Sequence, residues 1–272
     1  MTNAAPLTAN ELDALLRFYA DVGADEALGD EPIDRFATKN ERPRQRSLKA
    51  KTAQAAPPAT PAVPKSAVIP DQGVAESAGR LAAQAANLDQ LREVLAGFDG
   101  CNLKATSRHL AFEGGDRQAD LMIVGGAATR DDDARGSPFS GPDGVLLKNM
   151  MAAIGLDSQT QTYQALCVPW APPGGGPPTP IHLSILKPFV MRQIELAAPR
   201  HLLIMGNIAA KHLVDPKQMI LRLRGQKFDV SFGQWNGSAL VMHEPSYLRD
   251  QPSAKRATWH DLLALKKQLT LS

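Results

Sequence analysis

The sequence is poor in metal ligands. It has two cysteines, Cys101 and Cys167, in 272 residues, and its six histidines are scattered without an HxH or HxxxH spacing. An iron–sulfur cluster or a structural zinc site needs about four thiolate or imidazole ligands at fixed spacings. The two cysteines form no CxxC pair and cannot supply a four-thiolate site. We therefore expect two reduced thiols and no metal.

Long apolar runs are also absent. No stretch of about 18 apolar residues occurs, so no transmembrane helix is expected. The first residues, MTNAAPLTANELD, have no basic region followed by an apolar run, unlike a secretory signal peptide. The net charge of +2 does not by itself indicate a nucleic-acid partner. We expect a cytoplasmic protein that is monomeric and does not bind a membrane.

The N-terminal part of the chain divides into two segments. Residues 1–40 are expected to be a helical segment, because residues 10–22 carry apolar side chains at helical spacing. Residues 41–72 change character: from Arg42 to Pro70 there is no acidic residue and six side chains are basic, and between Pro57 and Pro70 five prolines interrupt an alanine-rich stretch. This composition predicts a disordered basic linker. It serves either as a solubilising tether or as a weak phosphate-binding arm.

Residues 73–272 are expected to form an α/β domain. The range 119–125 is a short apolar run that ends in glycine, typical of a buried parallel strand, and 201–206 is a further strand that ends in glycine. The range 163–168 is another strand candidate. Helical patterns cover 74–97, 145–154, 181–196, 208–214 and 255–268. Strands at 228–232 and 238–242 flank Asn236-Gly237, a hairpin signal. The alternation predicts a three-layer α/β/α sandwich with a central, mostly parallel sheet.

Two loops punctuated by glycine and proline follow apolar strands. The first is GSPFSGPDGVLL (136–147), and the second is PWAPPG (169–174). Loops of this kind build a pocket at the strand ends of an α/β domain. Phe139 lies between a proline and a glycine in the first loop, which suits an aromatic ring that stacks on another flat ring.

Four stretches in this order resemble the uracil-DNA glycosylase superfamily, and most closely its type 4, iron–sulfur branch. In the first (121–156), the family has a strand, a Gly-Glu-Ala-Pro-Gly loop, an acidic pair and Gly-x-Pro-Phe-x-Gly. In the second (168–180) it has Lys-Cys-Arg-Pro-Pro-Gly and then Thr-Pro. The third (193–214) carries a strand and a helix. The fourth (244–266) matches His-Pro-x-Tyr-Leu, Pro-x-x-Lys and Trp-x-Asp-Leu. The resemblance covers roughly residues 90–266.

The departures from the family pattern concern its cluster. The resemblance places the four cluster cysteines of the family on Phe98, Cys101, Trp170 and Leu186. Three of these four are large apolar side chains, so we expect a small hydrophobic plug in place of the cluster. Burial returns about 1.5–3 kcal/mol for each such side chain. The resemblance thus implies the family fold without its cofactor.

The base-binding positions have changed as well. The resemblance implies a base site at Phe139, Gly125, Gly126 and Leu166. Gly126 stands where the family has its first-loop glutamate, and Leu166 where the family has an asparagine that reads the base edge. Leucine makes no directed hydrogen bond, so discrimination between bases by such bonds is lost at that position. Phe139, the stacking aromatic ring, is kept.

The expected catalytic residues are Glu244, His243, Asp132 and Asp133. Glu244 aligns with the histidine of the family, and helps a departing base anion only if burial keeps it protonated. His243 replaces that histidine only if a bulge shifts the register, because successive strand residues face opposite ways. Asp132 and Asp133 align with the acidic pair, and either position water or cap a helix in a solvated loop.

The resemblance also implies DNA contacts, at Pro138, Ser140, Pro172, Ser246, Arg249 and Lys255. The expected partner is DNA, single-stranded or duplex with a flipped base. Two functions stay open. The first is hydrolysis of the N-glycosidic bond of a deaminated base in base excision repair. The second is a catalytically impaired DNA-binding or protein-interaction module that keeps the glycosylase fold.

Overall fold

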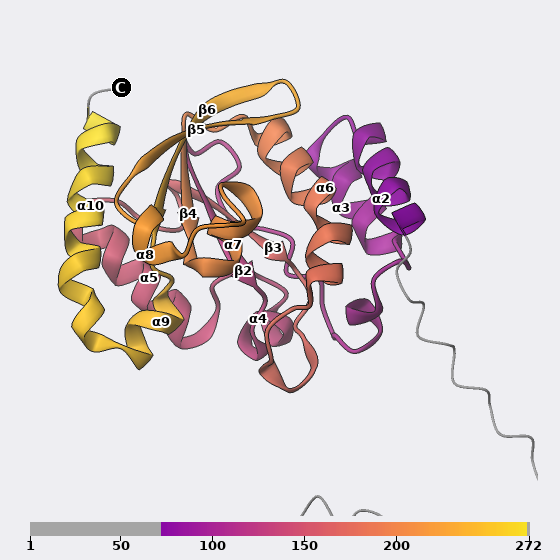
Figure 1. Cartoon of the computed structure of the whole chain (residues 1–272), viewed down its shortest axis with the longest axis horizontal. Helices are drawn as coiled ribbons and strands as arrows, with labels where there is room; N and C mark the ends of the chain where they lie inside the picture. The colour runs from indigo at the N-terminus through magenta and orange to yellow at the C-terminus, as the bar shows by residue number, and fades with distance from the viewer. Residues whose placement is uncertain (1–71, 271–272) are drawn as a thin grey trace, which may run out of the picture. The chain divides into compact units, whose positions relative to one another are not determined.

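A computed structural model describes residues 72–270 (Figure 1). The predicted N-terminal helical segment (1–40) and the predicted linker (41–72, apart from its last residue) lie outside the described residues. Within the described range no helix is both long enough and apolar enough to cross a membrane.

A six-stranded sheet forms the centre of the described domain. Its strands are β1 (Gly114–Gly115), β2 (Leu121–Ala127), β3 (Thr162–Val168), β4 (His201–Met205), β5 (Lys227–Phe232) and β6 (Trp235–Met242). Their order across the sheet is β1-β3-β2-β4-β6-β5. The four inner strands are parallel, and the outer strands β1 and β5 pair antiparallel with β3 and β6. In the sheet, β3 lies on one side of β2 and β4 on the other. The order in which the chain adds parallel strands therefore changes direction at β2.

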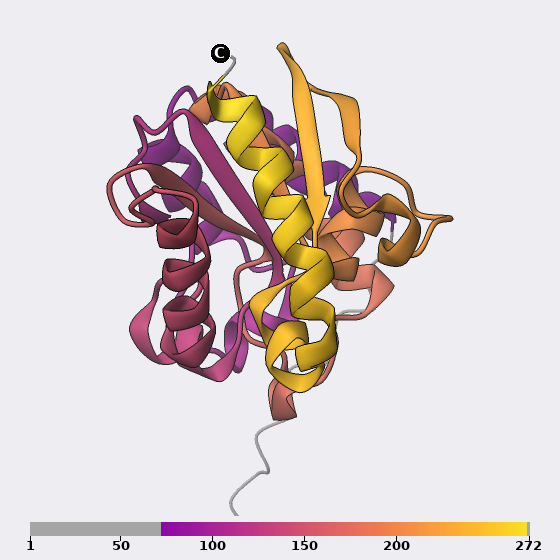
Figure 2. The same cartoon turned by 90° about the vertical axis from the view of Figure 1, so that its left-hand side faces the viewer.

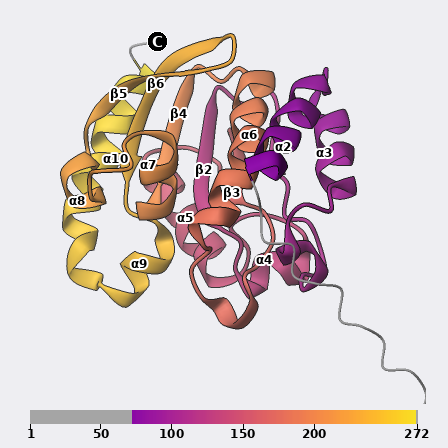
Figure 3. The same ribbon diagram turned by 45° about the vertical axis from the view of Figure 1, so that its right-hand side comes forward.

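Helices cover both faces of this sheet (Figures 1 and 3). One face carries α2 (Gln72–Gln84), α3 (Leu88–Gly97), α6 (Pro180–Ala197), α7 (Gly206–Leu213) and α8 (Ile220–Leu223). The other face carries α5 (Gly141–Ala153), α9 (Pro245–Asp250) and α10 (Lys255–Thr270). Figure 2 shows α10 lying along its face of the sheet. The short α4 (Arg130–Arg135) follows β2, and single turns occur at Asn102–Ala105, Pro173–Gly175 and Pro252–Ala254.

Side-chain alternation along the strands divides the interior into two cores. Met122 and Val124 of β2 pack with α2, α3 and α6, whereas Leu121 and Ile123 pack with α5 and α10. All seven residues of β3 are buried. Its two polar residues, Thr162 and Gln164, are buried with their side chains hydrogen-bonded, as the Gln164 amide donates to the carbonyl of Ser158 at 2.6 Å. The predicted three-layer α/β/α sandwich with a mostly parallel sheet is confirmed.

Two local predictions need correction. The helix expected over 74–97 is two helices, because Asn87 ends the run and caps α3 by accepting the N–H of Gln90 at 2.9 Å. The hairpin turns at Gly233 and Gln234, not at Asn236-Gly237, which lies inside β6. Gly233 adopts the required positive φ of 58°.

The position of the hairpin turn has a structural cause in Trp235. Its ring stacks on Phe232, the residue it pairs with across the turn, with centroids 5.9 Å apart and planes inclined by 3°. Its indole N–H also donates to the carbonyl of Pro199 at 3.0 Å. These two anchors fix the register of the hairpin more strongly than the Asn-Gly signal does.

Candidate functional site

The candidate site lies at the carboxyl ends of the inner strands. Gly125 of β2 and Leu166 of β3 are neighbours in the parallel register. Gly206 follows β4 directly, and His243 and Glu244 follow β6. Ligands of open α/β sheets bind at this edge, where the strand order switches. The fold therefore brings together residues that are more than one hundred positions apart in the sequence.

Phe139 covers Gly125. A Cβ built on Gly125 would lie 2.7 Å from Cζ of Phe139 and 2.8 Å from Cδ2 of Leu166. Phe139 has φ of 50°, a left-handed conformation that costs a non-glycine residue about 1–2 kcal/mol. The loop therefore keeps a strained backbone that sets its ring over a bare strand. Leu166, only 5% exposed, packs against the same ring and fills the space above Gly125.

Gly126 contacts a different part of the fold from Gly125. A Cβ at this position would lie 3.1 Å from Cβ of Ile208, in the first turns of α7. The predicted base-binding residues thus separate into two groups. Gly125, Phe139 and Leu166 share one contact zone, and Gly126 allows α7 to approach the sheet closely.

Asp132 holds both ends of the Phe139 loop. One carboxylate oxygen accepts the backbone N–H of Thr129 at 2.7 Å and its hydroxyl at 2.8 Å. The other accepts the N–H of Ser140 at 2.6 Å. These bonds form a capping box at the start of α4 and reach the first residue before α5. Burial still raises the pKa of Asp132 above its ordinary value, against the effect of these hydrogen bonds. Its predicted role in placing water stays a prediction.

Asp133 is tied to a different loop. Its carboxylate accepts the backbone N–H groups of Arg108 and His109 at 2.7 and 3.1 Å, and its carbonyl lies 2.7 Å from Nδ1 of His109. The geometry gives Asp133 a clear part in joining α4 to the segment before β1. Its predicted catalytic part is not tested by this arrangement.

Glu244 faces the strand ends. Its carboxylate lies over Gly206, in the space that a side chain at that position would take. Desolvation, with a smaller effect from the negative charge of Asp143, raises the pKa of Glu244 to about 7. A carboxyl group with this pKa is about half protonated at neutral pH, so it can donate a hydrogen bond. Any useful role of Glu244 beside a departing anion depends on this protonated form.

Asp143 is a site residue that sequence analysis did not identify. It occupies the first turn of α5, where a carboxylate is ordinary. In the fold it approaches Glu244, and burial raises its pKa. Its Oδ1 lies 3.2 Å from a guanidinium nitrogen of Arg249 in α9 but makes no well-directed hydrogen bond. Asp143 is placed beside Glu244 and Arg249 only because α5 packs near α9 in the fold. No local sequence signal could therefore have identified it.

His243 packs against α9. Its ring stacks on Tyr247 of α9, with centroids 4.6 Å apart and planes inclined by 24°. Burial, and then the positive charge of Arg224, lowers the pKa of His243 and favours the neutral ring. Arg224 itself is held by the carboxylate of Asp261 at 2.8 Å. The catalytic role predicted for His243 stays a prediction.

The predicted DNA contacts occupy three places around this edge. Pro138 and Ser140 are buried in the Phe139 loop, where the Ser140 hydroxyl donates to the carbonyl of Ser137 at 2.7 Å. Pro172 precedes the turn at Pro173–Gly175. The remaining contacts lie in or after α9, and they are Ser246, Arg249 and Lys255. Their contact with DNA stays a prediction.

The positions of the family cluster do not suit an iron–sulfur cluster in this chain. Phe98, Cys101, Trp170 and Leu186 are each at most 6% exposed and belong to one apolar core. They offer one sulfur atom, and burial raises the pKa of the Cys101 thiol, which disfavours the thiolate that metals bind. Phe98 packs on Phe189 with ring centroids 5.3 Å apart. Among the described residues no group of three His, Cys, Asp or Glu side chains is placed to hold a metal ion.

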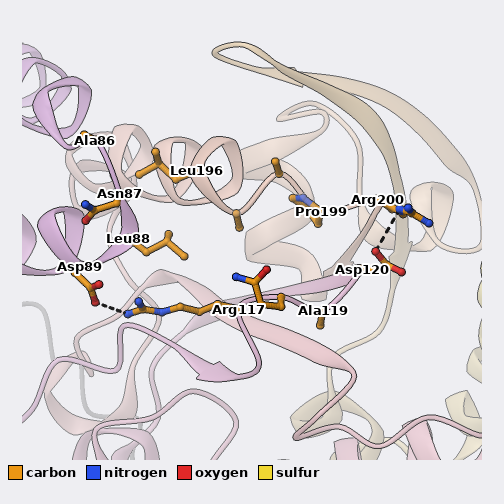
Figure 4. Close-up of a pocket in the computed structure, with 13 residues that line it drawn as sticks. Ala86, Asn87, Leu88, Asp89, Arg117, Ala119, Asp120, Leu196, Pro199 and Arg200 are labelled. Atoms are coloured by element: carbon orange, nitrogen blue, oxygen red, sulfur yellow. Dashed lines mark hydrogen bonds and ion pairs between the residues drawn. The ribbon is translucent and has the colours of Figure 1, made fainter.

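A polar crevice of about 460 Å³ lies at the opposite, amino ends of β2 and β4 (Figure 4). Its cations already have partners. Arg117 pairs with Asp89 at 2.8 Å, and Arg200 pairs with Asp120 at 3.3 Å. These ion pairs link α3 to the segment before β2, and the start of β2 to the start of β4, and both arginines of the crevice have an acidic partner.

Comparison with known proteins agrees with this architecture. The sequence model of the uracil DNA glycosylase superfamily matches residues 112–263. A type-4 uracil-DNA glycosylase of Archaeoglobus fulgidus is 27% identical over 192 residues, which cover 67% of this chain and 96% of the relative. Another, of Thermotoga maritima, is 28% identical over 151 residues, which cover 54% and 76%. The chain belongs to the uracil-DNA glycosylase superfamily and is a distant relative of its type-4 enzymes.

Proposed function

We propose that this protein binds a base flipped out of DNA against Phe139 and hydrolyses its N-glycosidic bond. Membership of the superfamily supports DNA as the substrate. The observation that carries the proposal is Glu244, whose carboxyl group is held at the strand ends with a pKa of about 7. We assign to the carboxylic acid of Glu244 the hydrogen-bond donor role that a histidine has in the type-4 pattern.

The reaction divides its work between two carboxyl groups. The bond between C1′ and the base nitrogen breaks, and its electron pair leaves with the base. Protonated Glu244 donates a hydrogen bond to the oxygen of the base, where negative charge develops. The hydroxide of a water molecule adds to C1′, and the remaining water proton neutralises the base. We assign to Asp143 the orientation of that water, because its Oδ1 makes no directed hydrogen bond, although it lies 3.2 Å from a guanidinium nitrogen of Arg249.

A strand-cleavage assay tests this function. Purified protein is incubated with single-stranded and duplex oligonucleotides containing uracil, hypoxanthine or xanthine, and alkali then reveals abasic sites. Two variants of one position form a matched pair: Glu244→Gln keeps a neutral donor, and Glu244→Ala removes it. We expect Glu244→Gln to retain excision, and Glu244→Ala and Phe139→Ala to lose it. Excision that survives in Glu244→Ala would overturn the assigned role of Glu244.

The packing of Leu166 favours a second candidate function. Leu166 touches both Gly125 and Phe139, and so takes the space that a stacked base would share. A protein of this shape could bind DNA without hydrolysis. Absence of cleavage at stoichiometric enzyme, together with salt-sensitive binding of the same oligonucleotides, would establish this second function.

A further inference from the structure

A second crevice opens beside the Phe139 loop. It encloses about 390 Å³ and lies between that loop, the last turn of α4 and the exposed side of α5. Phe139 itself lines it, as do Pro138 and Gly144. Phe139 therefore borders this crevice and also packs over Gly125 in the candidate base site.

Apart from Ser140, whose hydroxyl donates to the carbonyl of Ser137, the polar side chains that line this crevice have no ion-pair or hydrogen-bond partner among the described residues. Arg135 ends α4, Lys148 lies in the middle of α5, and both are exposed. Neither forms an ion pair with another residue between positions 72 and 270. The side chains of Ser137 and Gln159 also make no hydrogen bond within that range. This distinguishes the crevice from the one in Figure 4, where each arginine has an acidic partner.

No carboxylate lines the crevice. Acidic groups lie at its borders: Asp131 lies against Gly141, and Asp132 accepts the backbone N–H of Ser140. The pKa of Asp157 is lowered first by the backbone N–H groups of Gln159 and Thr160, and also by the charge of Lys148. Asp131 and Asp132 already face the N-terminal turn of α5, so the helix end does not attract a further anion. Attraction for an anion therefore comes from Arg135 and Lys148.

We propose that this crevice binds a backbone phosphate of the DNA strand next to the flipped nucleotide, with Arg135 and Lys148 as its two cationic contacts. The proposal rests on the proposed function, because it takes DNA as the ligand. A phosphodiester carries one negative charge and free oxygens, which suit a guanidinium and an ammonium group supported by hydroxyl and amide donors. Because Phe139 borders both spaces, a base stacked on its ring and the adjoining phosphate can be held together.

Salt-dependent binding of DNA tests the phosphate site. Fluorescence anisotropy follows the full chain binding a labelled single-stranded oligonucleotide without uracil, across about 50–300 mM NaCl. Arg135→Ala/Lys148→Ala is compared with Arg80→Ala/Lys266→Ala, which removes two exposed cations from α2 and the C-terminal half of α10. We expect the first variant to bind about tenfold more weakly at about 100 mM salt. Its slope of log K against log[salt] should fall by about 0.7 for each lost contact. The control variant should resemble wild type.

The outcomes separate this inference from the proposed function. If wild type and both double variants bind with equal affinity and slope, the phosphate site is wrong, while DNA remains the ligand. If the two double variants weaken binding equally, the attraction is general and the site is again wrong. If wild type binds no DNA, both the site and the proposed function fail.

A neutral linkage in the DNA locates the contact. An oligonucleotide with one uracil and a methylphosphonate at the adjoining linkage removes a single phosphate charge. We expect it to bind wild type more weakly than the natural oligonucleotide, and to bind Arg135→Ala/Lys148→Ala with no further loss. An equal loss in wild type and variant would show that the two side chains contact some other phosphate or none.

Discussion

The carboxylate of Glu244 occupies the place that a side chain at Gly206 would take. The two residues end adjacent parallel strands, and the missing side chain lets the carboxyl group lie against the backbone, away from bulk water. Burial thereby raises the pKa of Glu244, the residue that the resemblance aligns with the family histidine, to about 7. Burial supplies the proton-donating form that the residue type alone would not supply.

Base excision should fall as the pH rises through about 7. Only protonated Glu244 donates to the departing base, so the rate should drop about tenfold per pH unit well above the pKa. A single-turnover pH profile measures this, and Glu244→Gln should flatten it. Asp143→Asn removes the negative charge that helps raise this pKa, so its midpoint should lie at lower pH. A profile that is identical in all three proteins would contradict the role of Glu244.

The same group should make stability depend on pH. The folded-state pKa of about 7 lies above the ordinary 4.5, so the native state holds its proton more tightly than the unfolded chain. Stability is therefore lost as the pH rises from about 4.5 to 7, by roughly 1–3 kcal/mol. Urea unfolding should show Glu244→Gln more stable than wild type at about pH 8, with the difference vanishing near pH 4.5. A constant difference across this range would exclude the linkage.

Truncation of Leu166 should open the base site at a cost in stability. Leu166→Ala removes a nearly buried side chain and should lower the free energy of unfolding by about 2–4 kcal/mol. It also frees the space above Gly125, so binding of an oligonucleotide with a flipped base should strengthen, measured by anisotropy. Leu147→Ala is a matched control, because it truncates a buried leucine in the core that α5 and α10 form with the sheet, away from Leu166. It should cost stability without strengthening that binding.

Stability should depend on the apolar side chains that stand where the resemblance places the family's cluster cysteines, and not on metal. Trp170→Ala should lower the free energy of unfolding by about 3–5 kcal/mol, because it removes a buried indole from the core. Prolonged treatment with a chelator should leave the unfolding curve unchanged. Iron and sulfide analysis of freshly purified protein checks the same point, and stoichiometric iron would refute the expected loss of the cluster.

Asp132 should be needed for the shape of the Phe139 loop. Asp132→Ala removes the acceptor for Thr129 and Ser140 and should cost about 1–3 kcal/mol. Hydrogen exchange at the amide of Ser140 should quicken, as NMR would show. Asp131→Ala is the control, since its carboxylate is exposed and makes no hydrogen bond to either residue. Equal exchange rates in both variants would mean that Asp132 does not hold the loop.

Strand and helix patterns predicted most of the fold, because the buried strands β2 and β4 are mostly apolar and each is followed by a helical pattern. Strands were expected at 119–125, 163–168 and 201–206, and they occur at Leu121–Ala127, Thr162–Val168 and His201–Met205. The hairpin turn was misplaced because Trp235 anchors its register through Pro199, which is distant in sequence. The site was harder to predict. Asp143 gains its position from Arg249, and the pKa of Glu244 follows from burial, which no local pattern encodes.

The central place of β2 has a consequence for how the chain reaches this structure. Its partners β3 and β4 lie about 40 and 80 residues further along the chain, and both pairings are parallel. Such pairings close long loops before they gain stabilising contacts, which slows folding. The ring of Phe139 finds its place only after β2 and β3 have docked, and Glu244 only after β6 has joined β4. Refolding should therefore be slow, and recovery of base binding should coincide with completion of the sheet, not with early formation of the helices.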